Sequence, residues 1–331
     1  MFRWAALLGL LGLAVATAVI IWSGIDQVIL ALAQAGWGIL LVAVFHFIII
    51  AVSSAGWRVL VPGKSKPSLP TFFYFMWVRA AVNNLMPVAR IGGEIASVRL
   101  MTARGMRKNV AIAITIAELT LSIAAVFVFI ALGVILFALR VNDENFIRQL
   151  AWGFVFSVPV FAALVAVQKI GFFGLLSRLF RVAFRDKWKD FAGNAARLDR
   201  AVTIIYRRKK RALVCALWQF AAWSLGAVEI WLALYFLGHP LPLIEAAMLE
   251  ALIQGVVVVG FAVPAALGVQ EAGFLVFGGM LGLPHEVAAA LAIIRRCRDL
   301  ICYVPALIAW QADEGRRLFG VAVKKHSTSV G

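Results

Sequence analysis

Histidine and cysteine are scarce in this sequence. Its 331 residues include four histidines and three cysteines, and none of them are grouped at metal-ligand spacing. The sequence also has no HExxH, GxSxG or Walker A motif, which zinc peptidases, serine hydrolases and P-loop nucleotidases need for their chemistry. We therefore expect no metal centre, no cofactor, no enzymatic activity and no nucleotide-driven pump.

Acidic residues are also few. Aspartate and glutamate together number 16 against 32 lysines and arginines, so the net charge is +16. Apolar residues, by contrast, make up 63% of the chain, and the mean hydropathy is +0.94. A soluble domain is only about 45–50% apolar, so an aqueous fold could not bury this much apolar surface. The composition predicts an all-α polytopic membrane protein.

Six apolar runs are long enough to cross a hydrocarbon core of about 30 Å. They cover residues 4–22, 38–58, 110–139, 150–168, 212–237 and 287–311. Two further apolar regions, 70–104 and 243–283, are interrupted near their middle by proline and glycine, and a proline removes backbone hydrogen bonds from a continuous helix. The first run is too long for the apolar region of a signal peptide, so we expect a retained span.

Basic residues are concentrated in some connections and missing from others. Residues 23–37 and 238–286 contain no lysine or arginine, whereas the basic residues gather in 58–69, 104–108, 169–211 and the C-terminal tail. The positive-inside rule places this basic group, and both termini, in the cytoplasm of a bacterial inner membrane. The assignment requires each interrupted region to leave the membrane on the side that it entered. We therefore expect two re-entrant helical hairpins, one from each face.

The sequence also suggests an internal repeat. A shift of 177 residues lays Pro87 on Pro264, Glu94 on Glu271 and Gly105 on Gly282, and it lays the span 38–58 on 215–235 in the opposite orientation. We expect an inverted-topology repeat within one membrane domain, with repeat 1 over residues 38–139 and repeat 2 over 215–311. Such repeats are typical of transporters, where broken helices meet near the midplane. The alternative is that proline and glycine only kink two ordinary helices.

Three segments resemble a known family. VNNLMPVARIGGE (82–94), LGVQEAGFLVFGGMLGLP (267–284) and RRCRDLICYVPALIAWQ (295–311) resemble the flippase-like membrane family that includes the transmembrane half of lysylphosphatidylglycerol synthases. They are most similar to its hopanoid-biosynthesis-associated subgroup, and the resemblance covers about residues 5–315. It implies lipid translocation or movement of hopanoids between membranes. The soluble aminoacyl-transferase half of the synthases is absent here, so the resemblance implies no synthase activity.

Charged residues inside the apolar regions are the candidates for a substrate site. A charge at the bilayer centre costs about 2.5–3.5 kcal/mol on insertion scales, so each one needs a partner or a polar cavity. The candidate substrate-binding residues are Arg90, Glu94, Glu118, Glu229, Glu271, Arg295, Arg296, Arg298 and Asp299. The residues expected to form the hairpin turns are Pro87, Gly92, Gly93, Pro264 and Gly268.

Several of these residues have more than one interpretation. Glu94 and Glu271 either cap the half-helix that follows each break or line the substrate cavity. Arg90 either binds a phosphate or carboxylate, as a guanidinium does well, or pairs with Glu94. Under the repeat Glu118 corresponds to Arg295, and we consider a Glu118–Arg295 bridge across the pseudo-two-fold axis.

The other polar residues within or next to the apolar runs have different expected roles. Glu229 lies deep in its span and either lines the cavity or is protonated. Glu245 and Glu250 are expected at the outer interface, and a lone His46 is expected to be a packing residue. The basic connection 169–211 alternates apolar and basic residues, which favours amphipathic helices in the inner interface. Its charge is explained by topology, so nucleic-acid binding is not expected.

The sequence thus favours a lipid flippase or transporter for a hopanoid or another amphipathic or anionic lipid. The competing hypothesis is a scaffold that does not transport and that docks lipid-biosynthesis enzymes through the basic connection 169–211. Substitution of Arg90 and Arg295 would stop lipid transfer under the first hypothesis. Removal of the charges of the connection would matter more under the second.

Overall fold

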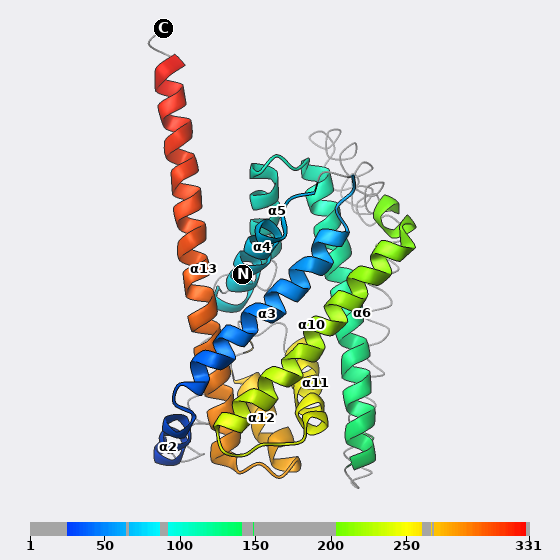
Figure 1. The fold of residues 1–331 in the computed structure, drawn as a ribbon, viewed down its shortest axis with the longest axis vertical. Helices are drawn as coiled ribbons and strands as arrows, with labels where there is room; N and C mark the ends of the chain where they lie inside the picture. Colours follow the sequence, from blue (N-terminus) through cyan, green and yellow to red (C-terminus); the bar gives the residue numbers. More distant parts are fainter. Residues whose placement is uncertain are drawn as a thin grey trace, which may run out of the picture.

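Helices make up all the regular structure in the residues that the computed structural model describes, which are 25–63, 66–86, 92–140, 148, 203–259, 266 and 268–328. The helices are α2 (Ile25–Ala35), α3 (Gly38–Val59), α4 (Leu69–Leu85), α5 (Gly92–Ala103), α6 (Lys108–Arg140), α10 (Lys209–Phe236), α11 (Leu243–Val259), α12 (Val269–Met280) and α13 (His285–Thr328) (Figure 1). The expected spans 4–22 and 150–168, and the basic connection up to residue 202, lie outside the described residues.

The prediction of an all-α membrane protein is confirmed over these residues. Within them, α3, α6 and α10 are long and apolar enough to cross a membrane, with 22, 33 and 28 residues. They coincide with three of the expected spans, and even the shortest is about 33 Å long at 1.5 Å per residue. The expected span 287–311 lies inside α13, a 44-residue helix that extends beyond the rest of the bundle (Figure 1).

The long helices α3 and α10 form a close antiparallel pair. A Cβ atom on Gly38 would lie 2.2 Å from the ring of Phe236, and one on Gly56 would lie 2.7 Å from the side chain of Trp218, so glycine is required at both contacts. Small residues allow membrane helices to approach closely and gain dispersion energy that lipid cannot replace.

Two pairs of short helices occupy opposite halves of the molecule. The pair α4–α5 lies in the upper half of Figure 1, and the pair α11–α12 lies in the lower half. In each pair the helices have 17 and 12 residues, or about 25 and 18 Å, which is less than a hydrocarbon core of about 30 Å. Ser68 caps the start of α4, because its hydroxyl accepts a hydrogen bond from the amide of Thr71 at 3.4 Å.

Helix boundaries in the two halves of the chain are related by the 177-residue shift. The shift carries the bounds of α5, 92 and 103, onto those of α12, 269 and 280, and it carries the first residue of α6 onto that of α13. The turns that follow α5 and α12 are also alike, because Gly105 and Gly282 have φ values of 86° and 85°. Both turns need a left-handed residue, which glycine adopts without strain.

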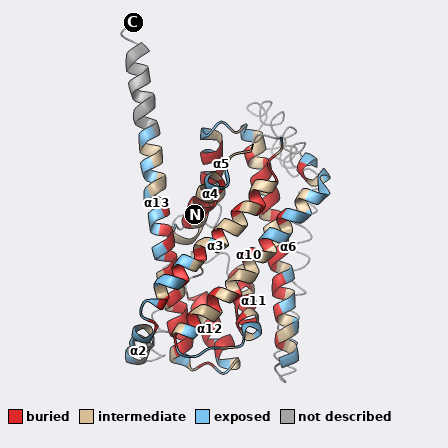
Figure 2. Cartoon of the chain, viewed as in Figure 1, coloured by how far each residue is buried: buried red, intermediate tan, exposed pale blue. Residues whose placement is uncertain are grey.

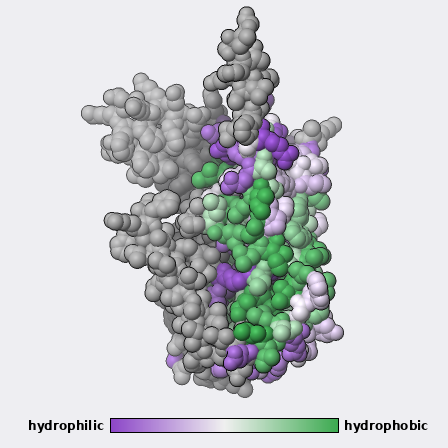
Figure 3. All heavy atoms as spheres, turned by 90° about the vertical axis from the view of Figure 1, so that its left-hand side faces the viewer, coloured by the Kyte–Doolittle hydropathy of each residue, from purple (hydrophilic) through white to green (hydrophobic). Residues whose placement is uncertain are grey.

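The two halves pack across each other. Helix α13 lies against α4, while α6 lies against α11, so the last helix of each half flanks the short pair of the other half. Buried residues are concentrated where these helices meet (Figure 2). Hydrophobic side chains form a broad band over the middle of the surface seen in Figure 3, and hydrophilic ones gather towards both ends, as expected for a protein in a bilayer.

Basic residues gather at one end of the bundle, which we call the basic end. It contains the α3–α4 connection, the α5–α6 turn and the start of α10, all in the upper part of Figure 1. Arg58, Lys66, Arg208 and Arg211 lie close enough to influence one another there. Partial burial, followed by the charges of the three arginines, lowers the pKa of the Lys66 ammonium.

Candidate functional site

Charged side chains inside the described part of the bundle form three clusters. The first-pair cluster contains Arg79, Asn83, Glu94 and Glu118. The central cluster contains His46, Glu229, Glu250, Gln254, Arg295, Arg298, Asp299 and Tyr303. The second-pair cluster contains Gln270, Glu271 and Arg296. The central cluster joins helices that are distant in sequence, whereas the other two join consecutive helices. Each lies in apolar surroundings, where the alternative to an internal partner is an unpaired charge.

Arg79 is the centre of the first-pair cluster. It extends from α4, is 6% exposed, and forms ion pairs with Glu94 of α5 and Glu118 of α6. Its guanidinium carbon also lies 5.1 Å from the ring centroid of Trp57, a distance suited to a cation–π contact. One cation therefore joins the two helices of the first short pair to each other and to α6.

The start of α5 packs closely against α4. The amide of Gly93 donates to the side-chain oxygen of Asn83 at 2.9 Å, which satisfies one of the free amides at the helix start. A Cβ atom on Gly93 would lie 2.3 Å from the carbonyl oxygen of Arg79, so no other residue fits without a shift of the backbone. Asn83 also donates to Glu94 at 3.4 Å and so orients the carboxylate that pairs with Arg79.

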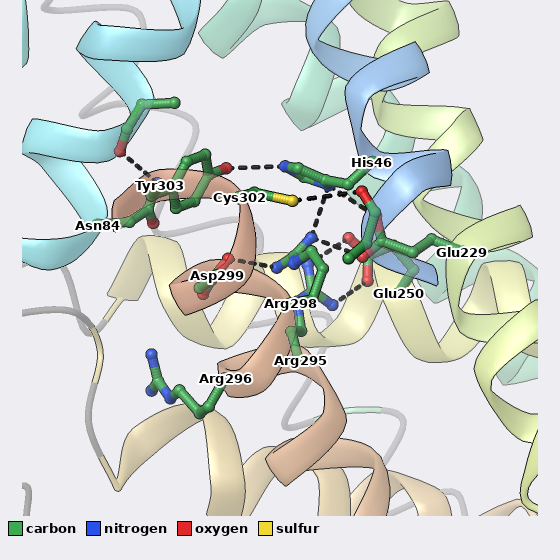
Figure 4. Close-up of polar contacts among 12 residues, drawn as sticks. His46, Asn84, Glu229, Glu250, Arg295, Arg296, Arg298, Asp299, Cys302 and Tyr303 are labelled. Atoms are coloured by element: carbon green, nitrogen blue, oxygen red, sulfur yellow. Dashed lines mark hydrogen bonds and ion pairs between the residues drawn. The ribbon is translucent and has the colours of Figure 1, made fainter. Parts of the chain in front are cut away.

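Arg298 is the most connected residue of the central cluster (Figure 4). Its Nη1 atom lies 2.5 Å from Oε1 of Glu229 and 2.8 Å from Nδ1 of His46, while its Nη2 atom lies 2.8 Å from Oδ1 of Asp299. The other ring nitrogen of His46 lies 2.8 Å from the hydroxyl of Tyr303. These residues come from α3, α10 and α13, and all are less than 10% exposed.

Glu250 forms the second half of the central cluster. Arg295 donates to both of its carboxylate oxygens, with Nη1 at 2.5 Å and Nη2 at 2.9 Å, the bidentate geometry that a guanidinium favours. Gln254 donates to the same carboxylate at 2.6 Å. Gly226 of α10 leaves room for Glu250, because a Cβ atom there would lie 2.9 Å from its Oε1 atom.

The second-pair cluster lies at the start of α12. Arg296 donates to Oε1 of Glu271 at 2.8 Å and to the carbonyl of Ala266 at 3.3 Å. Figure 4 shows its side chain directed away from those of Arg295 and Arg298. The Oε2 atom of Glu271 and the Nε2 atom of Gln270 are buried and have no hydrogen-bond partner among the described residues. Buried polar atoms seldom remain unsatisfied, so these two are the atoms of the cluster that could still form a hydrogen bond.

Comparison with known proteins identifies the family. The family of the lysylphosphatidylglycerol synthase transmembrane region matches residues 9–308. The chain belongs to this family. No curated protein and no solved structure matches the chain. Membership confirms the resemblance at the level of the family, and it gives the protein a multi-pass membrane location and a role connected with membrane lipid.

The arginines of the three clusters are paired, but the Glu118–Arg295 bridge that the repeat suggested is not formed. Glu118 does not contact Arg295; it pairs with Arg79, while Arg295 pairs with Glu250. Each pairing joins a first short helix to the last helix of the same half, but the charges are reversed. In the first half the cation is on α4, whereas in the second half it is on α13.

Most of the candidate residues are placed by the structure, and three lie outside the described residues. Glu94, Glu118, Glu229, Glu271, Arg295, Arg296, Arg298 and Asp299 are all in the three clusters. Gly92 and Gly93 begin α5, and Gly268, with φ of 76°, precedes α12. Pro87, Arg90 and Pro264, which the sequence placed at the breaks, lie outside the described residues.

Two residues of this family member were misread from sequence. Glu250 was expected at the outer interface, but it is 1% exposed and pairs with Arg295. His46 was expected to be a packing residue, yet both of its ring nitrogens contact polar side chains. Arg79 was not among the candidate residues chosen from the sequence. Its 8% side-chain exposure and two carboxylate partners make it the anchor of that region.

Among the described residues, two hollows lie at the end of the bundle opposite the basic end. One of about 560 Å³ is bounded by the end of α12 and the start of α13, including Met280 and His285. A neighbouring one of about 250 Å³ is lined by Arg140, Glu245 and the turn after α12. Arg140 pairs with Glu245 at 3.3 Å, so a polar surface faces this second hollow.

Proposed function

We propose that the protein translocates an amphipathic lipid across the bacterial inner membrane along a path between two re-entrant helix pairs. The observation that carries the proposal is the set of three buried charge clusters on helices that meet between pairs entering from opposite ends. Buried charges in a membrane domain are expensive, and they typically mark a substrate or ion pathway. The lipid-related family supports the same conclusion.

The arrangement of the short pairs supports their re-entrant character. The connection before α4 and the turn after α5 both lie at the basic end, so this pair enters and leaves on one side (Figure 1). The connection before α11 and the turn after α12 both lie at the opposite end. With the basic end in the cytoplasm, the C-terminus is cytoplasmic as well. The related helix boundaries support an inverted repeat of residues 38–139 and 215–311.

The charges in the path would exchange partners during transport. In the state described, each arginine of the clusters is paired with a carboxylate, which offsets the cost of burial. The Oε2 atom of Glu271 and the Nε2 atom of the adjacent Gln270 have no hydrogen-bond partner among the described residues, and Glu271 pairs with Arg296, whose side chain is 23% exposed. A lipid phosphate or hydroxyl group that reached this point could bond to Arg296 while the unpaired atoms gained a partner.

The substrate class that fits is a lipid with a polar or anionic headgroup, such as a hopanoid or an anionic phospholipid. No catalytic step is proposed, and the protein would need no cofactor. Movement would be passive or driven by an ion gradient. Under this proposal membrane lipids are the primary partners, and lipid-biosynthesis enzymes are partners only if they deliver the substrate.

Identification of bound lipid tests the proposal. The protein would be purified in native-lipid particles, and its lipids would be compared with those of the surrounding membrane. We expect enrichment of one lipid class, and a several-fold loss of enrichment in Arg296→Gln. The matched control is Arg140→Gln, which also breaks an Arg–Glu pair but at an exposed position. Absence of enrichment in the unaltered protein would contradict the proposal.

A scaffold would give a different pattern in the same experiment. Neutralisation of the basic residues in 169–211 would release any co-purifying enzymes, while Arg296→Gln would change neither enzyme nor lipid content. That result would contradict translocation and favour a scaffold that docks lipid-biosynthesis enzymes.

A further inference from the structure

His46 is placed between two groups that make opposite demands on it. Its Nδ1 atom lies 2.7 Å from Oε2 of Glu229 and 2.8 Å from Nη1 of Arg298. An ionised carboxylate only accepts hydrogen bonds, and a guanidinium only donates them. Nδ1 can serve Glu229 only when it carries a proton, and it can serve Arg298 only when it does not. The imidazole therefore has two competing hydrogen-bond arrangements in one position.

Tyr303 allows both arrangements. Its hydroxyl lies 2.8 Å from Nε2 of His46, and a hydroxyl can donate or accept. When Nε2 carries a proton, the imidazole donates to Tyr303; when it does not, Tyr303 donates to the imidazole. A proton can thus be added to or removed from His46 with no movement of the ring.

The charge balance of the central cluster favours one additional proton. Glu229, Glu250 and Asp299 contribute three negative charges, and Arg295 and Arg298 contribute two positive charges. With a neutral imidazole the cluster has a net charge of −1, whereas with an imidazolium it is neutral. An uncompensated charge in an apolar interior is costly, so the cluster gains from binding a proton.

The other groups that face His46 do not change this balance. Helix α10 contributes Glu229, and α13 contributes Arg298, Asp299, Tyr303 and the thiol of Cys302, which donates to a backbone carbonyl of α3 at 3.3 Å. Helix α4 also packs on α3, but its charged residue, Arg79, is directed to the carboxylates of the first-pair cluster. His46 is therefore the position at which the central cluster can take up a proton.

We propose that His46 and Glu229 form a proton-binding site and that lipid translocation is coupled to movement of a proton through it. Binding of a proton from one aqueous face converts His46 to imidazolium, which donates to Glu229 and weakens the hold of Glu229 on Arg298. Release of the proton to the other face restores the contact of Nδ1 with Arg298. Arg298 belongs to α13, which flanks the first short pair, so the proton state of His46 is linked to the position of that helix.

The proton site itself can be tested without a transport assay. Protein labelled with ¹⁵N-histidine in phospholipid vesicles would be followed by solid-state NMR across about pH 5–8, the range in which histidine changes charge. We expect one signal, absent from His46→Gln, to convert from the neutral to the doubly protonated form. In Glu229→Gln the cluster is already neutral, so His46 should remain neutral throughout. A His46 signal that never changes, or one that titrates unaltered in Glu229→Gln, would overturn the proposal.

Coupling, which rests on the proposed function, has its own test. Vesicles containing the protein, a labelled lipid and an internal pH indicator would be given a pH gradient. We expect the gradient to change the translocation rate several-fold in the unaltered protein, and the ratio of rates with and without the gradient to fall to one in His46→Gln. The control is His239→Gln, at an exposed position outside the cluster, which should keep the original ratio.

The outcomes separate the two proposals. If the pH gradient does not change the translocation rate of the unaltered protein, coupling is overturned but lipid translocation is still supported. A titrating His46 with no translocation by any variant would overturn the proposed function, and coupling with it, while supporting the proton site.

Discussion

The partner of Glu118 provides the sharpest structural prediction. In the structure its partner is Arg79, whereas the internal symmetry of the sequence pairs it with Arg295. The two possibilities differ in a measurable quantity, the coupling free energy between two substitutions. Glu118→Gln would be combined with Arg79→Gln in one double-mutant cycle and with Arg295→Gln in a second.

The magnitudes follow from burial. Arg79→Gln leaves two buried carboxylates without a cation, and loss of one partner from a buried pair costs about 3–5 kcal/mol. Glu118→Gln leaves Arg79 with Glu94 as a balanced pair, so a smaller loss of about 1–3 kcal/mol is expected. Because these residues are in contact, the first cycle should show a coupling of about 1–3 kcal/mol, while the second should be additive to within about 0.5 kcal/mol.

The assay is equilibrium unfolding in mixed detergent micelles with an increasing fraction of a denaturing detergent, followed by tryptophan fluorescence. A third cycle between Glu250 and Arg295 serves as a positive control, because these residues form a bidentate pair. A larger coupling of Glu118 with Arg295 than with Arg79 would refute the ion pair between α6 and α4 and restore the bridge considered from the sequence.

Three further substitutions test the fold around the site. Gly93→Ala should destabilise the protein by about 1–3 kcal/mol, because the new Cβ would lie 2.3 Å from a carbonyl oxygen; Gly255→Ala, with its nearest atom at 3.6 Å, should be close to neutral in the same unfolding assay. Asp313→Asn breaks an ion pair with Arg104 of 3.0 Å, and it should cost less than about 1 kcal/mol while increasing amide exchange at the end of α5. Trp77→Phe removes a hydrogen bond of 2.6 Å to a backbone carbonyl of α13, and a loss of about 0.5–1.5 kcal/mol in unfolding free energy is expected; no loss would contradict the contact between α4 and α13.

The positions of the buried charges could be read from sequence, because a charged residue in an apolar run is conspicuous. Their partners could not be read in this way. Glu118 and Arg295 correspond under the repeat, but residues at corresponding positions need not touch. The contacts depend on which helices pack together, and here each last helix bonds to the first short helix of its own half.

His46 illustrates a second limit of sequence analysis. Its neighbours in sequence are apolar, so it resembles a packing residue. Its actual partners, Glu229 and Tyr303, are 183 and 257 residues away. Only the close packing of α3 against α10 and α13 brings them together, and no local spacing encodes it.

The starts of the short helices were easier to predict from the sequence, because they depend on residues that lie close together in the chain. Asn83, the glycine pair that begins α5, and Glu94 lie within one short segment, and the side chain of Asn83 bonds to the start of α5. The same logic places Glu271 in the first turn of α12. The chemistry of a helix start is set by adjacent residues, whereas that of the central cluster is set by the tertiary fold.

The most direct test of the account is the rate at which purified protein moves a labelled form of its enriched lipid between the leaflets of a vesicle. The account predicts a rate well above that of protein-free vesicles, and a loss of at least several-fold in Arg298→Gln, which removes the cation shared by Glu229 and Asp299. A rate equal to that of empty vesicles, or an unchanged rate in Arg298→Gln, would contradict it.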